Sequence, residues 1–145
     1  MTERKRIMGL DIGEKRIGVA VSDELGITAQ GIATIERKNW REDVRRLSAL
    51  IEEYGISELV VGFPRRMDGT LGKKAEEIKE VIEKLKKALK IKVVPWDERL
   101  TTVEAERVLI DGGLRREKRR KVIDKLAAVI ILKGYLEYLR AKEEG

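Results

Sequence analysis

The order of apolar segments along the chain constrains its fold more than any other feature of the sequence. Three short segments with strand character come first, at Arg6–Ile12, Arg16–Ser22 and residues 27–35. Helices are then predicted over residues 42–54, 75–89 and 101–111, strands over 59–63 and 91–96, and a long helix after the basic stretch 115–121 that ends near residue 141. A strand meander followed by alternating helices and strands predicts an α/β protein with a mixed five-stranded sheet and helices on both faces.

Cysteine and histidine are both absent from the 145 residues. Their absence excludes disulfides and thiolate metal sites, and it removes the commonest general base and zinc ligand. Any bound metal must therefore be held by oxygen atoms, which favours Mg²⁺ or Mn²⁺.

The length fits a single domain over residues 1–145. The N-terminus lacks an apolar signal region and no apolar run approaches a bilayer span, so we expect a soluble, cytoplasmic protein without a membrane partner.

The balance of charge is basic, with a formal net charge of +6 and a pI near 9.5. Such a balance suggests a polyanionic partner, and lysine and arginine contacts to phosphates would position a nucleic acid without reading its sequence. A solvated charged surface is the competing interpretation, although the run at residues 118–121 is dense enough to favour binding. The candidate nucleic-acid-binding residues are Arg65, Arg66, Lys73, Arg115, Arg116, Lys118, Arg119, Arg120 and Lys121.

Two acidic positions fall at the ends of predicted strands. Asp11 lies near the end of an apolar strand, where an unpaired carboxylate is costly to desolvate, and the alternative is an ordinary turn aspartate. Asp97 and Glu98 follow the strand at 91–96. Successive residues point in opposite directions, so only one of this pair is expected to face Asp11. Alternatively, one of the two favours the dipole of the helix that begins near residue 102.

A third acidic position, Asp124, falls on the packed side of the last predicted helix, because it shares a stripe with Ala127, Ala128 and Ile131. Here the alternative is a salt bridge to Lys121 or Arg120 within the same helix. Three carboxylates that meet at one edge of a sheet repel each other strongly unless a cation lies between them. Two divalent ions about 4 Å apart can activate water and stabilise a leaving oxygen without any histidine. The pattern therefore predicts a site for metal-dependent phosphoryl transfer.

Four segments of the chain are similar to the signature segments of the YqgF/RuvX family: GLDIGEKRIGVAVSD, VVGFPRRMDGTLG, DERLTTVEAE and KVIDKLAAVIIL. They occur in the expected order over nearly the whole chain. The resemblance implies a ribonuclease H-like fold, a relationship to bacterial Holliday junction resolvases, and a metal-dependent nuclease that matures the 5′ end of pre-16S rRNA. It also implies Asp11, Glu98 and Asp124 as catalytic and metal-binding residues, with Asp97 as the alternative to Glu98. In related resolvases the middle acid ends the preceding strand, whereas that strand here ends VVGFP.

The sequence leaves other functions open. A resolvase acting on DNA junctions makes two symmetric cuts and therefore needs a dimer, whereas no large apolar surface beyond the core is legible, which favours a monomer. A non-catalytic nucleic-acid-binding factor for ribosome assembly would keep its binding without Asp11 and would not respond to metal. A sugar-kinase-like ATPase also begins with an Asp-x-Gly strand, but that architecture needs two such domains, which 145 residues cannot supply.

Overall fold

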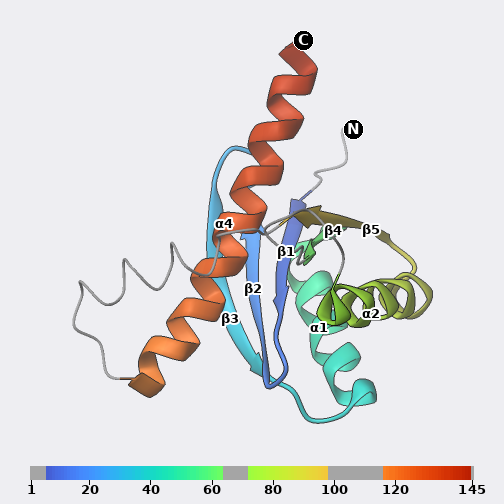
Figure 1. Cartoon of the computed structure of the whole chain (residues 1–145). Coiled ribbons are helices and arrows are strands. Elements are labelled where there is room, and N and C mark those ends of the chain that lie inside the picture. The colour runs from blue at the N-terminus through green and yellow to red at the C-terminus, as the bar shows by residue number, and fades with distance from the viewer. Residues whose placement is uncertain (1–5, 64–71, 98–115, 145) are drawn as a thin grey trace.

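The computed structural model describes residues 6–63, 72–97 and 116–144 (Figure 1). The described elements are β1 (Arg6–Ile12), β2 (Arg16–Ser22), β3 (Ala29–Glu36), α1 (Trp40–Tyr54), β4 (Ile56–Phe63), α2 (Lys73–Leu89), β5 (Lys92–Asp97) and α4 (Arg116–Glu144). The five strands form one sheet in the order β3-β2-β1-β4-β5. β1, β2 and β3 pair antiparallel, whereas β4 is parallel to β1 and β5 is parallel to β4. The predicted mixed sheet and its N-terminal meander are thus confirmed.

The sheet separates two apolar layers, because alternate residues of a strand face opposite sides. Met8 and Leu10 of β1 are fully buried in the layer that α1 and α2 cover. Ala20 of β2 and Val60 of β4 are fully buried in the opposite layer, against α4. Figure 1 shows α4, in orange to red, crossing one face of the sheet while α1 and α2 lie on the other. Helices therefore cover both faces, as predicted.

Local signals in the chain determine where α1 begins and ends. The side chain of Asn39 accepts a hydrogen bond of 2.9 Å from the backbone N–H of Glu42, which satisfies one of the free donors of the first turn. Gly55 follows the last turn with φ 63° and ψ 48°, a left-handed conformation that glycine adopts without a steric penalty. The helix starts two residues earlier than predicted, because the cap lies ahead of the apolar periodicity.

Other element boundaries also differ from the prediction by a few residues. β4 begins at Ile56 and includes the acidic Glu58, whose carboxylate accepts a hydrogen bond from the hydroxyl of Tyr135 on α4. The predicted basic stretch at 115–121 belongs to α4 from Arg116 onward, so most of it is helical backbone. The helix predicted over 101–111 lies outside the described residues. Within the ranges that the structure describes, no helix is long and apolar enough to cross a membrane.

Candidate active site

The backbone of α4 passes close to the sheet at Gly18 of β2. A Cβ atom on Gly18 would lie 1.8 Å from the backbone oxygen of Asp124, so only glycine permits this contact. Asp11 of β1 is the direct cross-strand partner of Gly18. Directly paired residues of an antiparallel ladder project to the same face of the sheet, so the half-buried Asp11 side chain lies on the face that α4 covers. Asp11 and Asp124 therefore share one face and one end of the sheet.

Asp124 lies on the packed stripe of α4, as the helical spacing predicts. Ala127, Ala128 and Ile131 are all at least 99% buried. The carboxylate of Asp124 is 20% exposed and accepts a hydrogen bond of 2.7 Å from Nε of Arg16, on β2. The ion pair therefore joins Asp124 to the sheet. The alternative prediction from the sequence was a salt bridge to Lys121 or Arg120 within the same helix. Lys121 instead has its ammonium 3.8 Å from Glu36.

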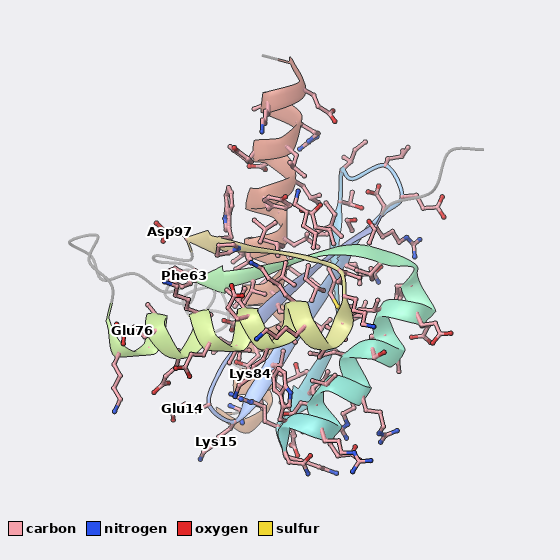
Figure 2. The ribbon with its side chains drawn as sticks, turned by 90° about the vertical axis from the view of Figure 1, so that its right-hand side faces the viewer. Glu14, Lys15, Phe63, Glu76, Lys84 and Asp97 are labelled. Carbon is pink, nitrogen blue, oxygen red and sulfur yellow. The ribbon has the colours of Figure 1, made fainter. Side chains whose placement is uncertain are left out.

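Of the two acids that follow the predicted strand at residues 91–96, the structure describes only Asp97. Asp97 is the last residue of β5, paired with Phe63, and not the first residue after the strand (Figure 2). Trp96 packs in the layer under α4, so alternation directs Asp97 to the opposite face. There it lines a pocket of about 530 Å³ together with Phe63 and Pro95. Asp97 is therefore not on the face that carries Asp11 and Asp124. Glu98 lies outside the described residues.

The predicted basic residues are placed by the elements that carry them. Lys73 is exposed in the first turn of α2. Lys121 is exposed on α4, and its backbone oxygen accepts a hydrogen bond of 2.8 Å from Thr34 of β3, which holds this turn of the helix against the sheet. The α4 backbone leads directly from the basic run into Asp124, and the residues of that run within it are Arg116, Lys118, Arg119 and Arg120. Arg65, Arg66 and Arg115 lie outside the described residues.

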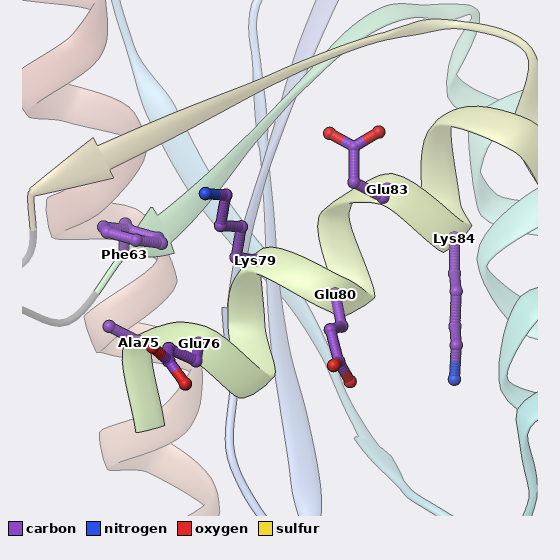
Figure 3. A pocket seen from close by; sticks show the side chains of 7 residues that line it. All are labelled: Phe63, Ala75, Glu76, Lys79, Glu80, Glu83 and Lys84. Atoms are coloured by element: carbon purple, nitrogen blue, oxygen red, sulfur yellow. The ribbon is translucent and has the colours of Figure 1, made fainter. Parts of the chain in front are cut away.

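Another pocket, of about 510 Å³, is lined by α2 and by Phe63 at the end of β4 (Figure 3). Glutamates and lysines are interspersed along its helical wall, a pattern typical of a solvated helix face. Its lining residues are Phe63, Ala75, Glu76, Lys79, Glu80, Glu83 and Lys84. The pocket is on the face opposite to α4 and contains neither Asp11 nor Asp124. Size alone therefore does not identify the candidate active site.

The donor set on the α4 face fits a hard divalent cation. Asp11 and Asp124 offer carboxylate oxygens, which Mg²⁺ and Mn²⁺ prefer, and both carboxylates are partly shielded from water. Among the described residues, no group of three or more potential metal ligands is assembled. Two carboxylates on one face still make a cation favourable there, because it relieves their repulsion.

The sheet order and the position of α4 define the ribonuclease H-like class of nuclease folds. The structure of the fowlpox virus resolvase with its substrate Holliday junction DNA is similar, with a TM-score of 0.55 and 18% identity, over 92% of this chain and 98% of that one. A structure of Thermus thermophilus RuvC in complex with a Holliday junction substrate has a TM-score of 0.51 and 18% identity, over 94% of this chain and 96% of that one. These similarities confirm the predicted fold.

The chain belongs to the RuvX family, described as Holliday junction resolvase, whose model matches residues 5–138. A relative from Halothermothrix orenii is 56% identical over 133 residues, which are 92% of this chain and 95% of that protein, and it is named "Putative pre-16S rRNA nuclease". The family resemblance predicted from the sequence is confirmed. The protein is accordingly a nuclease, a hydrolase of phosphodiester bonds.

Sequence reasoning missed two residues of this site, Arg16 and Gly18. Both lie on the face of β2 that α4 covers, since they are two residues apart in the strand. The sequence of β2 contained a signal for this face. Its alternate residues Arg16, Gly18 and Ala20 place one charged and two small residues on the same side of the strand. The β1–β2 hairpin places Gly18 opposite Asp11, so the strand register indicates the same face.

Proposed function

We propose that the chain is a divalent-metal-dependent nuclease that processes the 5′ end of pre-16S rRNA in the cytoplasm. The observation that carries the metal dependence is the placement of Asp11 and Asp124 on one face, where the backbone of α4 passes close to Gly18 of β2. The name of the Halothermothrix orenii relative, at 56% identity over nearly its whole length, supports the choice of substrate.

The proposed roles are divided between the acidic residues, which bind metal, and the basic residues, which bind phosphate. Asp11 and Asp124 would hold the metal, with Glu98 as the proposed third ligand. Metal held by these residues would provide activation of the attacking water and stabilisation of the leaving oxygen of the phosphodiester. The basic residues at the start of α4, together with Lys73, bind the phosphate backbone and hold the scissile bond over the acids. Because these contacts read no bases, the shape of the folded precursor selects the cutting position.

A DNA junction resolvase is the second candidate, and the family description and the two similar structures favour it. The discriminating experiment is an end-mapped cleavage assay with Mg²⁺ or Mn²⁺, comparing a pre-16S leader with a four-way DNA junction. We expect cuts near the mature 5′ end of the RNA and an uncut junction. Paired symmetric cuts in the junction, with an intact RNA, would replace the proposed substrate with DNA. Binding of the RNA without metal-dependent cutting would indicate an assembly factor.

Metal binding is expected to be visible in thermal stability. Millimolar Mg²⁺ or Mn²⁺ should raise the melting temperature of the wild-type protein, because a ligand bound only by the native state stabilises it by about 2.7 kcal/mol at one hundred times its Kd. Asp11→Asn should show a much smaller shift. Asp23→Asn is the matched control, since Asp23 follows the end of β2 that is remote from Arg16 and should keep the wild-type shift. Equal shifts in all three proteins would exclude a metal site at Asp11.

A further inference from the structure

The ion pair between Arg16 and Asp124 links the β1–β2 hairpin to α4. Its N–O distance is 2.7 Å, and the two side chains are only 22% and 20% exposed. It joins residues 108 positions apart in the chain, on β2 and α4. By contrast, the Arg45–Glu42 pair has a similar distance of 2.8 Å but lies within α1, with Arg45 71% exposed. Exposed pairs contribute little, whereas a shielded pair interacts more strongly because less water screens it.

The guanidinium of Arg16 belongs to the same face as the two candidate metal ligands. Arg16 is two residues from Gly18, and Gly18 is the cross-strand partner of Asp11. Arg16, Asp11 and Asp124 thus gather where α4 crosses the hairpin. Among these three side chains, the guanidinium offsets the charge of one of the two carboxylates and so reduces the repulsion between them.

From this geometry we infer that Arg16 is the internal counter-cation of Asp124, and that a divalent metal competes with Arg16 for the Asp124 carboxylate. The inference rests on the proposed function, since it requires a metal at Asp11 and Asp124. Arg16 is a positioning residue: it keeps Asp124 directed at the sheet, and it weakens metal binding because its charge repels the incoming ion. A metal must share or displace the guanidinium at Oδ2.

The charge of Arg16 determines whether its substitution should raise or lower the affinity for metal. Removal of the positive charge at position 16 takes away both the competing partner and the repulsion of the ion, so the affinity for metal should rise. A purely structural role predicts the opposite, because a loosened Asp124 would bind metal less well. Metal affinity therefore separates the two roles, whereas loss of thermal stability alone would not.

The test measures the Kd of Mn²⁺ alone, by calorimetry or by electron paramagnetic resonance, on the full chain without nucleic acid. Arg16→Met and Arg16→Gln remove the charge, and the second retains a hydrogen-bond donor in case the first does not fold. We expect both to bind Mn²⁺ at least about threefold more tightly than the wild type. Arg16→Lys, which keeps the charge, and Arg45→Met, which removes an arginine from an exposed pair of similar length, should stay within about twofold.

The outcomes separate this inference from the function on which it rests. Unchanged or weaker Mn²⁺ binding in Arg16→Met and Arg16→Gln, with wild-type binding that Asp11→Asn abolishes, would overturn the role of Arg16 and leave the metal site standing. Equal tightening in Arg45→Met would also overturn it, because the effect would then reflect net charge alone. Absence of Asp11-dependent binding in the wild type would overturn both the inference and the proposed metal site.

Discussion

Replacing Asp11 by asparagine is expected to lower metal-dependent cleavage of a pre-16S leader by about 10³-fold or more, which corresponds to about 4 kcal/mol of transition-state stabilisation. The substitution keeps the size of the side chain but removes the negative charge that holds the metal. Since Asp11 lies near the end of β1 and is only half-buried, the fold should remain. Single-turnover cleavage with end-labelled RNA measures the loss, and circular dichroism verifies the fold.

The control for this experiment is Asp23→Asn, which removes one carboxylate from an exposed turn and should cut at the wild-type rate. RNA binding by Asp11→Asn should also persist, because the proposed phosphate contacts come from basic residues elsewhere. If Asp11→Asn cuts as fast as the wild type, Asp11 has no part in the mechanism. The metal-dependent reaction would then need a different set of ligands.

Gly18→Ala is expected to produce the largest loss of stability among simple substitutions at this site. The new Cβ would lie 1.8 Å from the backbone oxygen of Asp124 and 2.4 Å from its carbonyl carbon. The atoms in conflict belong to the helix backbone, which cannot change rotamer as a side chain can, so α4 must move away from β2. We expect the free energy of unfolding to fall by about 3 kcal/mol or more, which is at the high end for overpacking, as measured by urea denaturation.

Gly55→Ala provides a matched glycine substitution without a steric conflict. Gly55 has a φ of 63°, but nothing lies within 4 Å of its hypothetical Cβ. Only backbone strain opposes alanine there, at a cost of about 1 kcal/mol. A Gly18→Ala protein that is no less stable than Gly55→Ala would show that α4 does not approach the sheet as closely as described. The same displacement should also reduce cleavage, since Asp124 moves with the helix.

The sequence predicted the architecture well because alternation and helical periodicity report directly on which faces are buried. The apolar stripe beside Asp124 is an example, and its inward orientation is confirmed by the burial of Ala127 and Ala128. Errors occurred where a polar residue interrupts the pattern. Glu58 concealed the start of β4, although its carboxylate is satisfied by Tyr135. Burial and the Glu58 contact together raise the pKa of Tyr135, so this hydroxyl remains a donor over the physiological range.

The candidate site was only half accessible to sequence reasoning. The residue type and strand position of Asp11 were sufficient to select it as a candidate, because a carboxylate at the end of an apolar strand is costly to desolvate unless a cation or a donor compensates it. The Arg16–Asp124 pair could not be predicted, since it depends on which turn of α4 crosses which residue of β2. That choice is determined by tertiary packing between segments 108 residues apart. Local patterns contain no information about such a register.

The long separation between the hairpin and α4 has a consequence for when the enzyme becomes active during its own synthesis. The strand that carries Asp11 leaves the ribosome early, whereas α4 follows only after the rest of the sheet has been made. A nascent chain therefore holds one carboxylate of the site without the other. In the proposed site, packing of α4 brings Asp124 to the face that carries Asp11, so cleavage activity is expected only after this helix has been made and has packed on the sheet.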